Sequence, residues 1–372
     1  MKMQTEKLFD TNPYDTEFTA QVVGAENGEV VLDRTLFFPE EGGQTCDKGY
    51  LEYGGKQFEV EAVRIEDEVI YHRIDTDELK AGDKVTGHID WAHRFDNMQN
   101  HTGEHIFSGI VHSMKGYDNV GFSLTETTCQ MDYNGKLTDK EIAEVEAKAN
   151  QVIWSALTVD CRYPSKEELA TIDYRSKKEL TGAVRIVTIP GVDVCACCAP
   201  HVKTTAEVGV LKVLSHLNYK GGTRLYIACG RRAYSEFVSD FDALTDIGHL
   251  FSTGRPDALD AVKKLIDEKQ TLKNELAEFQ KAELFKQIDT TDKDTVFTKI
   301  TDRNILNSAF NHFKEVHDGA CFIFSEKGDG SYTFLAGGRD IDARTLLVGL
   351  KEKYNVRGGG KSDMIQGSAT PL

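Results

Sequence analysis

The stretch QNHTGEHIFSGIVH, residues 99–112, places two histidines among apolar residues at helical spacing. His101 and His105 are four positions apart, and residues at i and i+4 lie on one face of a helix. Both imidazoles can therefore point at the same object. The neighbouring apolar residues Ile106, Phe107, Ile110 and Val111 indicate that this helix also contributes to a core. The stretch alone leaves open whether the object is a metal, a carboxylate, an RNA phosphate or nothing in particular.

The chain has 372 residues, enough for two or three domains. It carries 44 Lys and Arg against 60 Asp and Glu, a formal net charge of −16. A protein that coats nucleic acid nonspecifically needs a positive face, so this balance argues against that class, although not against a local basic patch. The sequence contains neither a signal-peptide pattern nor an apolar run long enough to span a bilayer. We expect a cytoplasmic protein without a membrane partner.

Cysteines are concentrated in one place. Of the eight in the chain, three lie within residues 195–198. In a reducing compartment, clustered cysteines indicate metal binding or redox chemistry rather than disulfides. Within CACCAPHV, Cys197 and His201 have the spacing C-x-x-x-H, and zinc usually takes four thiolate or imidazole ligands in a tetrahedron.

The sequence therefore predicts a zinc site built from two remote segments. Its candidate ligands are His101, His105, Cys197 and His201. Cys195 and Cys198 remain alternatives to Cys197.

Two other metal-dependent classes fit poorly. An H-E-x-x-H metalloprotease needs Glu directly after the first histidine, where this chain has Thr102, and Glu104 lies elsewhere on the helix. A nucleobase deaminase would combine P-C-x-x-C with H-x-E. Cys195 and Cys198 do form C-x-x-C, but neither companion feature is present.

Periodicity and turn residues predict a multidomain α+β protein. Residues 1–90 alternate apolar and polar residues between Asn-Gly and Gly-Gly pairs, as in a small β-barrel or curled antiparallel sheet. Residues 91–240 mix helices and strands, with Thr138 as the predicted cap of one helix. Residues 241–290 are predicted to form a helical linker, which is either a lone amphipathic helix or a short coiled coil or helical hairpin. Residues 291–372 form a small α/β domain that ends in a glycine-rich tail.

Four motifs, in order along nearly the whole chain, resemble alanyl-tRNA synthetase editing domains and the free-standing AlaX proteins. H-T-G-E-H resembles the family's H-T-A-x-H, and Asp90–Trp91 with Arg94 and Met98 resembles the lead-in to it. TLFFPEEGGQTCDKG resembles T-x-F-Y-P-x-x-G-G-Q, and C-C-A-P-H stands where the family has C-G-G-T-H. GGGKSDMIQG resembles the GGG-x-x-x-x-x-Q-G motif of the DHH-associated domain. The chain is thus similar to the long form of AlaX, whose first domain resembles the barrels of translation proteins.

This resemblance implies an aminoacyl-tRNA deacylase, which acts in trans on tRNA(Ala) mischarged with serine. An alanine pocket cannot strongly reject serine, so a second site must remove it. Thr35 is implied as the reader of the serine hydroxyl, and Gln44 as the contact to the ester or the terminal ribose. Gly42 and Gly43 would let the backbone approach the substrate. The resemblance assigns no general base.

The GGQ loop already lies at residues 42–44, so we expect no aminoacylation core and no charging of tRNA. The absence of an Asp-His-His motif argues against a DHH-type phosphoesterase. The resemblance implies that the terminal domain binds the tRNA body, and a homodimer through this domain or the helical region is a further prediction. The candidate phosphate contacts are basic residues and the terminal glycines: Lys220, Arg224, Arg231, Arg357, Gly358, Gly359, Gly360 and Lys361.

Two other functions compete with a zinc-dependent deacylase of Ser-tRNA(Ala). The first is a tRNA-binding module whose zinc is structural and which performs no catalysis. The second is a metal-dependent hydrolase of a small ester or amide, which leaves the terminal domain unexplained. The sequence leaves open whether Gly-tRNA(Ala) is also a substrate and whether the zinc is catalytic.

Overall fold

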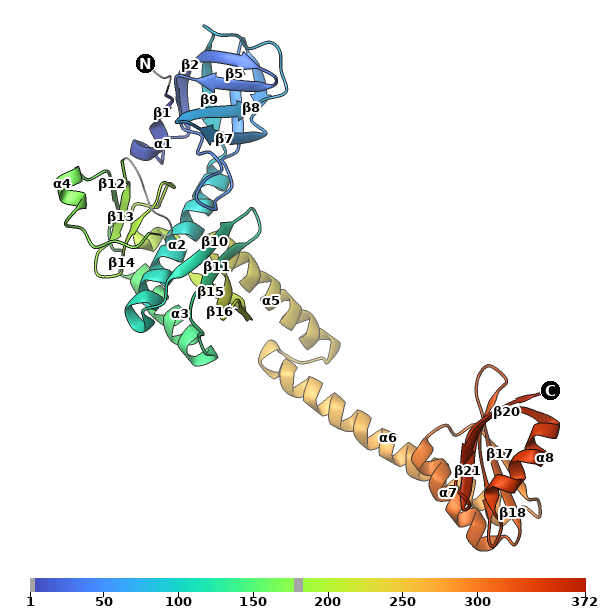
Figure 1. The fold of residues 1–372 in the computed structure, drawn as a ribbon. Helices are drawn as coiled ribbons and strands as arrows, with labels where there is room; N and C mark the ends of the chain where they lie inside the picture. The colour runs from blue at the N-terminus through green and yellow to red at the C-terminus, as the bar shows by residue number, and fades with distance from the viewer. Residues whose placement is uncertain (1–3, 177–182) are drawn as a thin grey trace. The chain divides into compact units, whose positions relative to one another are not determined.

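A computed structural model describes residues 4–176 and 183–372 (Figure 1). The chain divides into two compact units, Met1–Ala243 and Leu244–Leu372. Each unit combines helices with strands, which confirms the mixed α and β class. Among the described helices, none is long and apolar enough to cross a membrane.

The first part of the amino-terminal unit is a seven-stranded antiparallel sheet that curls around its own core (Figure 1). Its order is β6-β5-β9-β2-β3-β8-β7. In β2, Phe18, Ala20 and Val22 are buried between exposed neighbours, which is the period-two pattern of a half-buried strand. The strands are β2 (Glu17–Glu26), β3 (Glu29–Leu32), β5 (Gly49–Tyr53), β6 (Lys56–Glu59), β7 (Ala62–Glu66), β8 (Val69–Arg73) and β9 (Lys84–Ile89). The short strand β1 (Glu6–Lys7) pairs in parallel with β4 (Arg34–Thr35). A short helix, α1 (Leu8–Thr11), directly follows β1 in the sequence.

The histidine-bearing helix, α2 (Trp91–Lys115), runs through the centre of the amino-terminal unit. Asp90 caps its first turn by accepting a hydrogen bond from the His93 amide, and Gly116 ends it in the left-handed conformation. Almost every residue from Arg94 to Val111 is buried, because other elements surround the helix: α3 (Asp139–Trp154), β14 (Asp193–Ala196) and β16 (Gly222–Cys229) all contact it.

Two sheets accompany this helix. The first has the order β10-β11-β16-β15, and the second consists of β12, β13 and β14. Thr138 caps α3 in a reciprocal capping box with Glu141, as predicted. The remaining elements are β10 (Asn119–Leu124), β11 (Cys129–Tyr133), β12 (Asp160–Arg162), α4 (Lys166–Leu169), β13 (Ile186–Ile189), the 3₁₀ turn Thr205–Val208 and β15 (Leu211–Tyr219).

The carboxy-terminal unit holds a five-stranded sheet of order β17-β18-β19-β21-β20. The division between the units falls within α5 (Gly230–Leu250), a helix that the sequence analysis did not predict. The predicted linker helix is α6 (Ala258–Asp289). The other elements are β17 (Thr295–Thr298), α7 (Arg303–Val316), β18 (Ala320–Glu326), β19 (Tyr332–Gly338), α8 (Leu346–Lys353), β20 (Tyr354–Gly360) and β21 (Met364–Pro371), with 3₁₀ turns at Arg255–Asp257 and Ala343–Thr345.

The prediction of a glycine-rich tail is wrong, because these residues form the β20–β21 hairpin. Gly358 pairs with Gly367, and Gly360 pairs with Ile365. A Cβ atom on Gly358 would lie 2.4 Å from the carbonyl oxygen of Gln366, so the two backbones approach too closely for a side chain. The glycines that suggest a loop in the sequence are instead needed because the two strands pair closely.

A buried ion pair connects α2 to the curled sheet. Arg94 is completely buried, and its Nε donates to Asp47 at 2.9 Å while Nη2 contacts the second oxygen of the same carboxylate. The guanidinium also donates to the carbonyl oxygens of Leu36 and Pro13, at 2.5 and 3.0 Å. Asp47 follows the GGQ loop in sequence. Arg94 therefore fixes the start of α2 against the segments on both sides of that loop.

We predict that Arg94→Met lowers the free energy of unfolding of the amino-terminal unit by about 3–5 kcal/mol, because it leaves Asp47 buried without its counter-charge. Both tryptophans, Trp91 and Trp154, belong to this unit, so urea unfolding followed by their fluorescence measures the change. The matched control is Arg64→Met, which removes an exposed pair with Glu29 and should cost less than about 1 kcal/mol. Equal losses in the two variants would contradict the prediction.

Candidate metal centre

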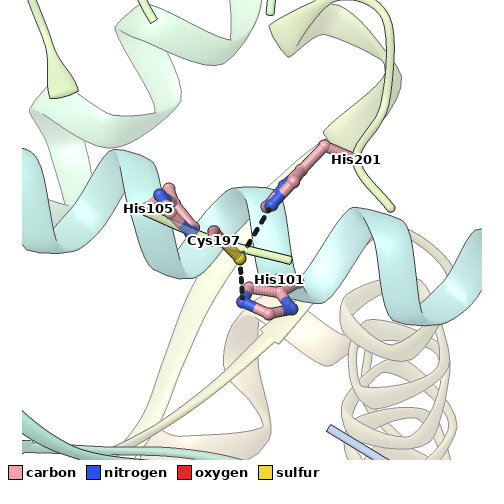
Figure 2. Close-up of side chains that lie close together, drawn as sticks. All are labelled: His101, His105, Cys197 and His201. Carbon is pink, nitrogen blue, oxygen red and sulfur yellow. Dashed lines mark hydrogen bonds between the residues drawn. The ribbon is translucent and has the colours of Figure 1, made fainter. Parts of the chain in front are cut away.

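The structure brings the four predicted ligands together. His101 and His105 come from α2, and Cys197 and His201 come from the loop after β14 (Figure 2). One ligand atom from each residue lies within 4.8 Å of all the others. The Cys197 Sγ is 3.5 Å from Nε2 of His101 and 3.4 Å from Nε2 of His201.

These distances fit a tetrahedral zinc ion. With a zinc–sulfur distance of about 2.3 Å and a zinc–nitrogen distance of about 2.05 Å, a tetrahedron places sulfur and nitrogen about 3.6 Å apart. The observed separations of 3.5 and 3.4 Å are close to this value. Three imidazoles and one thiolate are also ligands that zinc prefers.

Each imidazole is oriented by a different polar side chain. In all three rings the contact is made through Nδ1, which leaves Nε2 directed at the ligand cluster. Such outer partners fix the tautomer and the ring orientation of metal-binding histidines. The pairs are His101 with Gln44 Oε1 at 2.7 Å, His105 with Asp193 Oδ2 at 2.9 Å, and His201 with Thr102 Oγ1 at 2.9 Å.

The cysteine cluster contains one thiol with a distinct environment. Burial raises the pKa of Cys197, but the charges of His101 and His201 outweigh burial and hold its pKa well below the usual value. Burial instead raises the pKa of Cys195 to about 11, and burial together with the neighbouring Cys197 raises that of Cys198 further. Because the thiolate is the form that binds metal, the structure favours Cys197 over the two alternatives.

The outer partners include residues that the sequence analysis did not single out. Asp193 accepts from both His105 and Arg175, whose Nε is 2.8 Å away. Arg185 donates to the carbonyl oxygens of Cys197 and Ala199, at 3.1 and 2.8 Å, and so holds the ligand loop. No local pattern marks Asp193 or Arg185, because their role depends on strand pairing with distant segments.

The GGQ loop reaches the ligand cluster from the curled sheet. Gln44 is completely buried; its Oε1 contacts His101, and its Nε2 has no hydrogen-bond partner among the described residues. Gly42 and Gly43 both have positive φ, and a Cβ on Gly43 would lie 2.5 Å from the carbonyl oxygen of Phe122. The loop therefore packs directly against β10, and glycine is required there.

Thr35, the predicted hydroxyl reader, lies in the core of the curled sheet. It is completely buried, and its Oγ1 accepts from the Phe37 amide at 3.1 Å. The same oxygen is 2.9 Å from Nε2 of His72, whose Nδ1 is 3.0 Å from the Val30 carbonyl oxygen. Since Nδ1 must donate to that carbonyl, Nε2 accepts the Thr35 proton.

The predicted tRNA contacts differ in how accessible they are. Arg224 donates to both oxygens of Asp132 at 2.6 Å and stacks on Tyr219, so it is largely engaged. The Arg231 side chain is 62% exposed, and Lys220 lies at the turn between β15 and β16. In the carboxy-terminal unit, Gly358, Gly359 and Gly360 end β20, with Arg357 and Lys361 exposed on either side of them.

Comparisons with known proteins agree with this arrangement. A family model described as "tRNA synthetases class II (A)" matches residues 2–93, and one described as "Threonyl and Alanyl tRNA synthetase second additional domain" matches residues 184–226. The chain is 29% identical to "Alanyl-tRNA editing protein AlaX-L" of Pyrococcus horikoshii, over 97% of this chain and 94% of that protein. The resemblance to AlaX-type proteins is confirmed. The second matched segment contains both residues of the C-x-x-x-H pair.

Alanine–tRNA ligases also match this chain, and two of them are described here. The ligase of Ignicoccus hospitalis is 32% identical over 74% of this chain, and that of Hyperthermus butylicus is 29% identical over 97%. The chain spans 32% and 42% of the lengths of these two ligases. The similarity therefore covers a part of each ligase, whereas it covers nearly all of the AlaX-L protein.

We predict that Asp193→Asn weakens zinc binding about 10- to 100-fold, because His105 loses the carboxylate that orients it. Competition with a chromophoric chelator measures the affinity directly. A matched control exists on the same helix, where His112 makes an exposed contact of 2.9 Å with Asp118. Asp118→Asn should leave zinc affinity unchanged. An unchanged affinity in Asp193→Asn would contradict the assigned orientation of His105.

Proposed function

We propose that this chain is a trans-editing hydrolase that removes serine from mischarged Ser-tRNA(Ala). The observation that carries the proposal is the buried three-histidine, one-cysteine cluster that Gln44 reaches from a second sheet. The similarity to a protein named for alanyl-tRNA editing, over nearly the whole chain, supports the reaction class. The reaction is hydrolysis of the ester between the amino acid and the terminal ribose, with water as the nucleophile.

The chain's own residues bind and orient the ester. The buried Nε2 of Gln44 is a hydrogen-bond donor without a partner in the described part of the chain, and an unsatisfied donor of this kind favours a ligand oxygen such as the ester carbonyl or a ribose hydroxyl. Gly42 and Gly43 would support this contact through their positive φ values, which let the loop pack against β10 and bring Gln44 to the cluster. When bound by the four ligands, zinc would supply Lewis-acid polarisation of the carbonyl.

Serine selection is assigned to Thr35. Its oxygen accepts from Phe37 and donates to His72, which leaves one lone pair for the hydroxyl of a seryl group. A seryl hydroxyl would donate to this lone pair, an interaction that alanine cannot make. Glycine lacks the hydroxyl as well, so clearance of Gly-tRNA(Ala) would depend on the size of the pocket rather than on Thr35.

The tRNA body would bind through local basic residues. Lys220 and Arg231 are the candidates in the amino-terminal unit, and Arg357 and Lys361 with the glycines of β20 are the candidates in the other. Within this proposal, residues 1–90 form the barrel domain, 91–240 the zinc-containing editing domain, 241–290 the helical linker and 291–372 the DHH-associated domain. A protein that acts on tRNA(Ala) would work in the cytoplasm.

Self-association through the linker is part of the same proposal. The α6 helix exposes apolar residues at steps of seven, four and three positions, with Lys269 interrupting the first step, a spacing that is compatible with a short coiled-coil seam in a homodimer. These residues are Leu265, Leu272, Leu276 and Phe279, each at least half exposed.

A tRNA-binding module with a structural zinc is the second candidate. One feature favours it: the cluster supplies four protein ligands, the number found in closed structural sites, whereas catalytic zinc usually keeps a position open. The two candidates differ in a single measurable property, the release of the amino acid.

We predict that the protein releases serine from Ser-tRNA(Ala) at least about 100-fold faster than alanine from Ala-tRNA(Ala), since a site that hydrogen-bonds a substrate hydroxyl discriminates strongly against its absence. Release of labelled amino acid measures both rates. His105→Ala should abolish hydrolysis and lower zinc content together, whereas His112→Ala, on the exposed end of the same helix, should change neither. Hydrolysis of neither substrate, with tRNA binding intact, would favour the structural-zinc module.

A further prediction concerns Thr35. Thr35→Val keeps the side-chain volume but removes the hydroxyl, so the ratio of serine to alanine release should fall at least about tenfold while alanine release is little changed. The control is Thr19→Val, an exposed position on β2. If Thr35→Val keeps the wild-type ratio, another residue reads the serine hydroxyl.

A further inference from the structure

We infer that Glu41 binds the α-ammonium group of the seryl ester, an assignment that rests on the proposed function and deepens it. Every aminoacyl-tRNA carries this cationic group on the carbon next to the ester carbonyl. The contacts proposed above assign the carbonyl to Gln44 and the serine hydroxyl to Thr35, but none of them receives the positive charge. A site for an aminoacyl ester needs such an acceptor, because an ammonium group that leaves water without a partner costs free energy.

Glu41 and Gln44 lie opposite each other at the two ends of a tight turn. The Glu41 amide donates to the Gln44 carbonyl oxygen at 3.2 Å, and the Gln44 amide donates to the Glu41 carbonyl oxygen at 3.0 Å. In such a directly opposed antiparallel pair, both side chains leave the backbone on the same face, with Cβ atoms about 5 Å apart. Gly42 and Gly43, both with positive φ, form the turn between them.

Both of these side chains reach the ligand cluster. Gln44 Oε1 contacts His101 at 2.7 Å, whereas Glu41 accepts a hydrogen bond from the thiol of Cys198, the residue after the candidate ligand cysteine. The turn itself follows the same line, since a Cβ atom on Gly42 would lie 3.5 Å from Cys198 Sγ. The turn therefore lies along one edge of the cluster, with an amide at one end and a carboxylate at the other.

The functional groups at the two ends are available to a ligand. Glu41 is exposed, and its carboxylate forms no ion pair with a lysine or arginine in the part of the chain that the structure describes. Arg185, whose charge acts on Cys198, is already engaged by Asp10 at 3.7 Å and by two carbonyl oxygens of the ligand loop. At the other end, the buried Nε2 of Gln44 has no hydrogen-bond partner among the described residues.

This pair of groups is complementary to an α-amino ester. The ester carbonyl accepts hydrogen bonds and the neighbouring ammonium donates them, so the amide N–H of Gln44 and the carboxylate of Glu41 match them in kind and in order. A hydrogen bond between a carboxylate and an ammonium is stronger than one between neutral groups. Holding both groups also fixes the rotation about the bond between the carbonyl carbon and Cα, which directs the serine side chain. Glu41 is thus a substrate-binding residue.

A role confined to holding the turn in place leads to a different expectation. Glutamine at position 41 keeps an oxygen that can accept from the Cys198 thiol, so this contact should survive while the negative charge is lost. A substrate in which a hydroxyl replaces the α-ammonium loses the positive charge with little change in size. The effect of Glu41→Gln on these two substrates therefore separates ammonium binding from support of the turn.

The experiment measures kcat/KM of the full-length zinc-loaded protein for Ser-tRNA(Ala) and for its deaminated analogue. Glu41→Gln should lower the value for Ser-tRNA(Ala) at least about tenfold, the effect of one hydrogen bond to a charged group, and the value for the analogue less than about threefold. Zinc content and melting temperature should stay at wild-type values. The matched control is Glu40→Gln, which removes the neighbouring exposed carboxylate and should change neither value.

Two results would overturn the assignment. Unchanged values for both substrates would show that the charge of Glu41 is not used in binding. An equal loss for both substrates would show that the variant disturbs the turn rather than a contact with the ammonium. If the wild-type protein itself fails to hydrolyse Ser-tRNA(Ala), the proposed function fails first, and that failure is seen in the wild type rather than in the variant.

Discussion

Three imidazoles converge on one thiol because a polar side chain holds the opposite nitrogen, Nδ1, of each ring. A histidine can rotate about two side-chain bonds and can carry its proton on either nitrogen. In this protein Gln44, Asp193 and Thr102 each contact an Nδ1 atom, so that every Nε2 faces Cys197. The metal centre is thus determined by its outer contacts as much as by its ligands. Those contacts come from three separate parts of the chain: the curled sheet, β14 and α2 itself.

This arrangement explains why the ligands are recognisable in the sequence and their supports only in part. The ligands occur as H-x-x-x-H and C-x-x-x-H, two local patterns with a direct chemical meaning. Thr102 and Gln44 lie inside quoted motifs, but spacing alone could not reveal that one orients His201 and the other His101. Asp193 lies in no motif, because its contact with His105 exists only after β14 has packed against α2.

The same distinction applies to the fold. The alternation in β2 and the capping box at Thr138 are local signals, and both were interpreted correctly from the sequence. The glycines of β20 were misread because their small size serves a close backbone approach, which composition cannot separate from a flexible turn. The α5 helix was missed although Tyr234, Phe237 and Phe241 recur in it at three- and four-residue steps, which is the period of a helix.

Because Gln44 orients His101, the ligand cluster depends on a residue outside the domain that carries the ligands. All four candidate metal ligands come after residue 90, yet the group that orients one of them comes from the preceding sheet, which Arg94 ties to the same helix. A fragment that began at α2 would carry the complete donor set with His101 free to turn away. Recombination that exchanged the two halves between relatives would have to keep the glutamine and the glycine pair before it, so the two halves are constrained to diverge together.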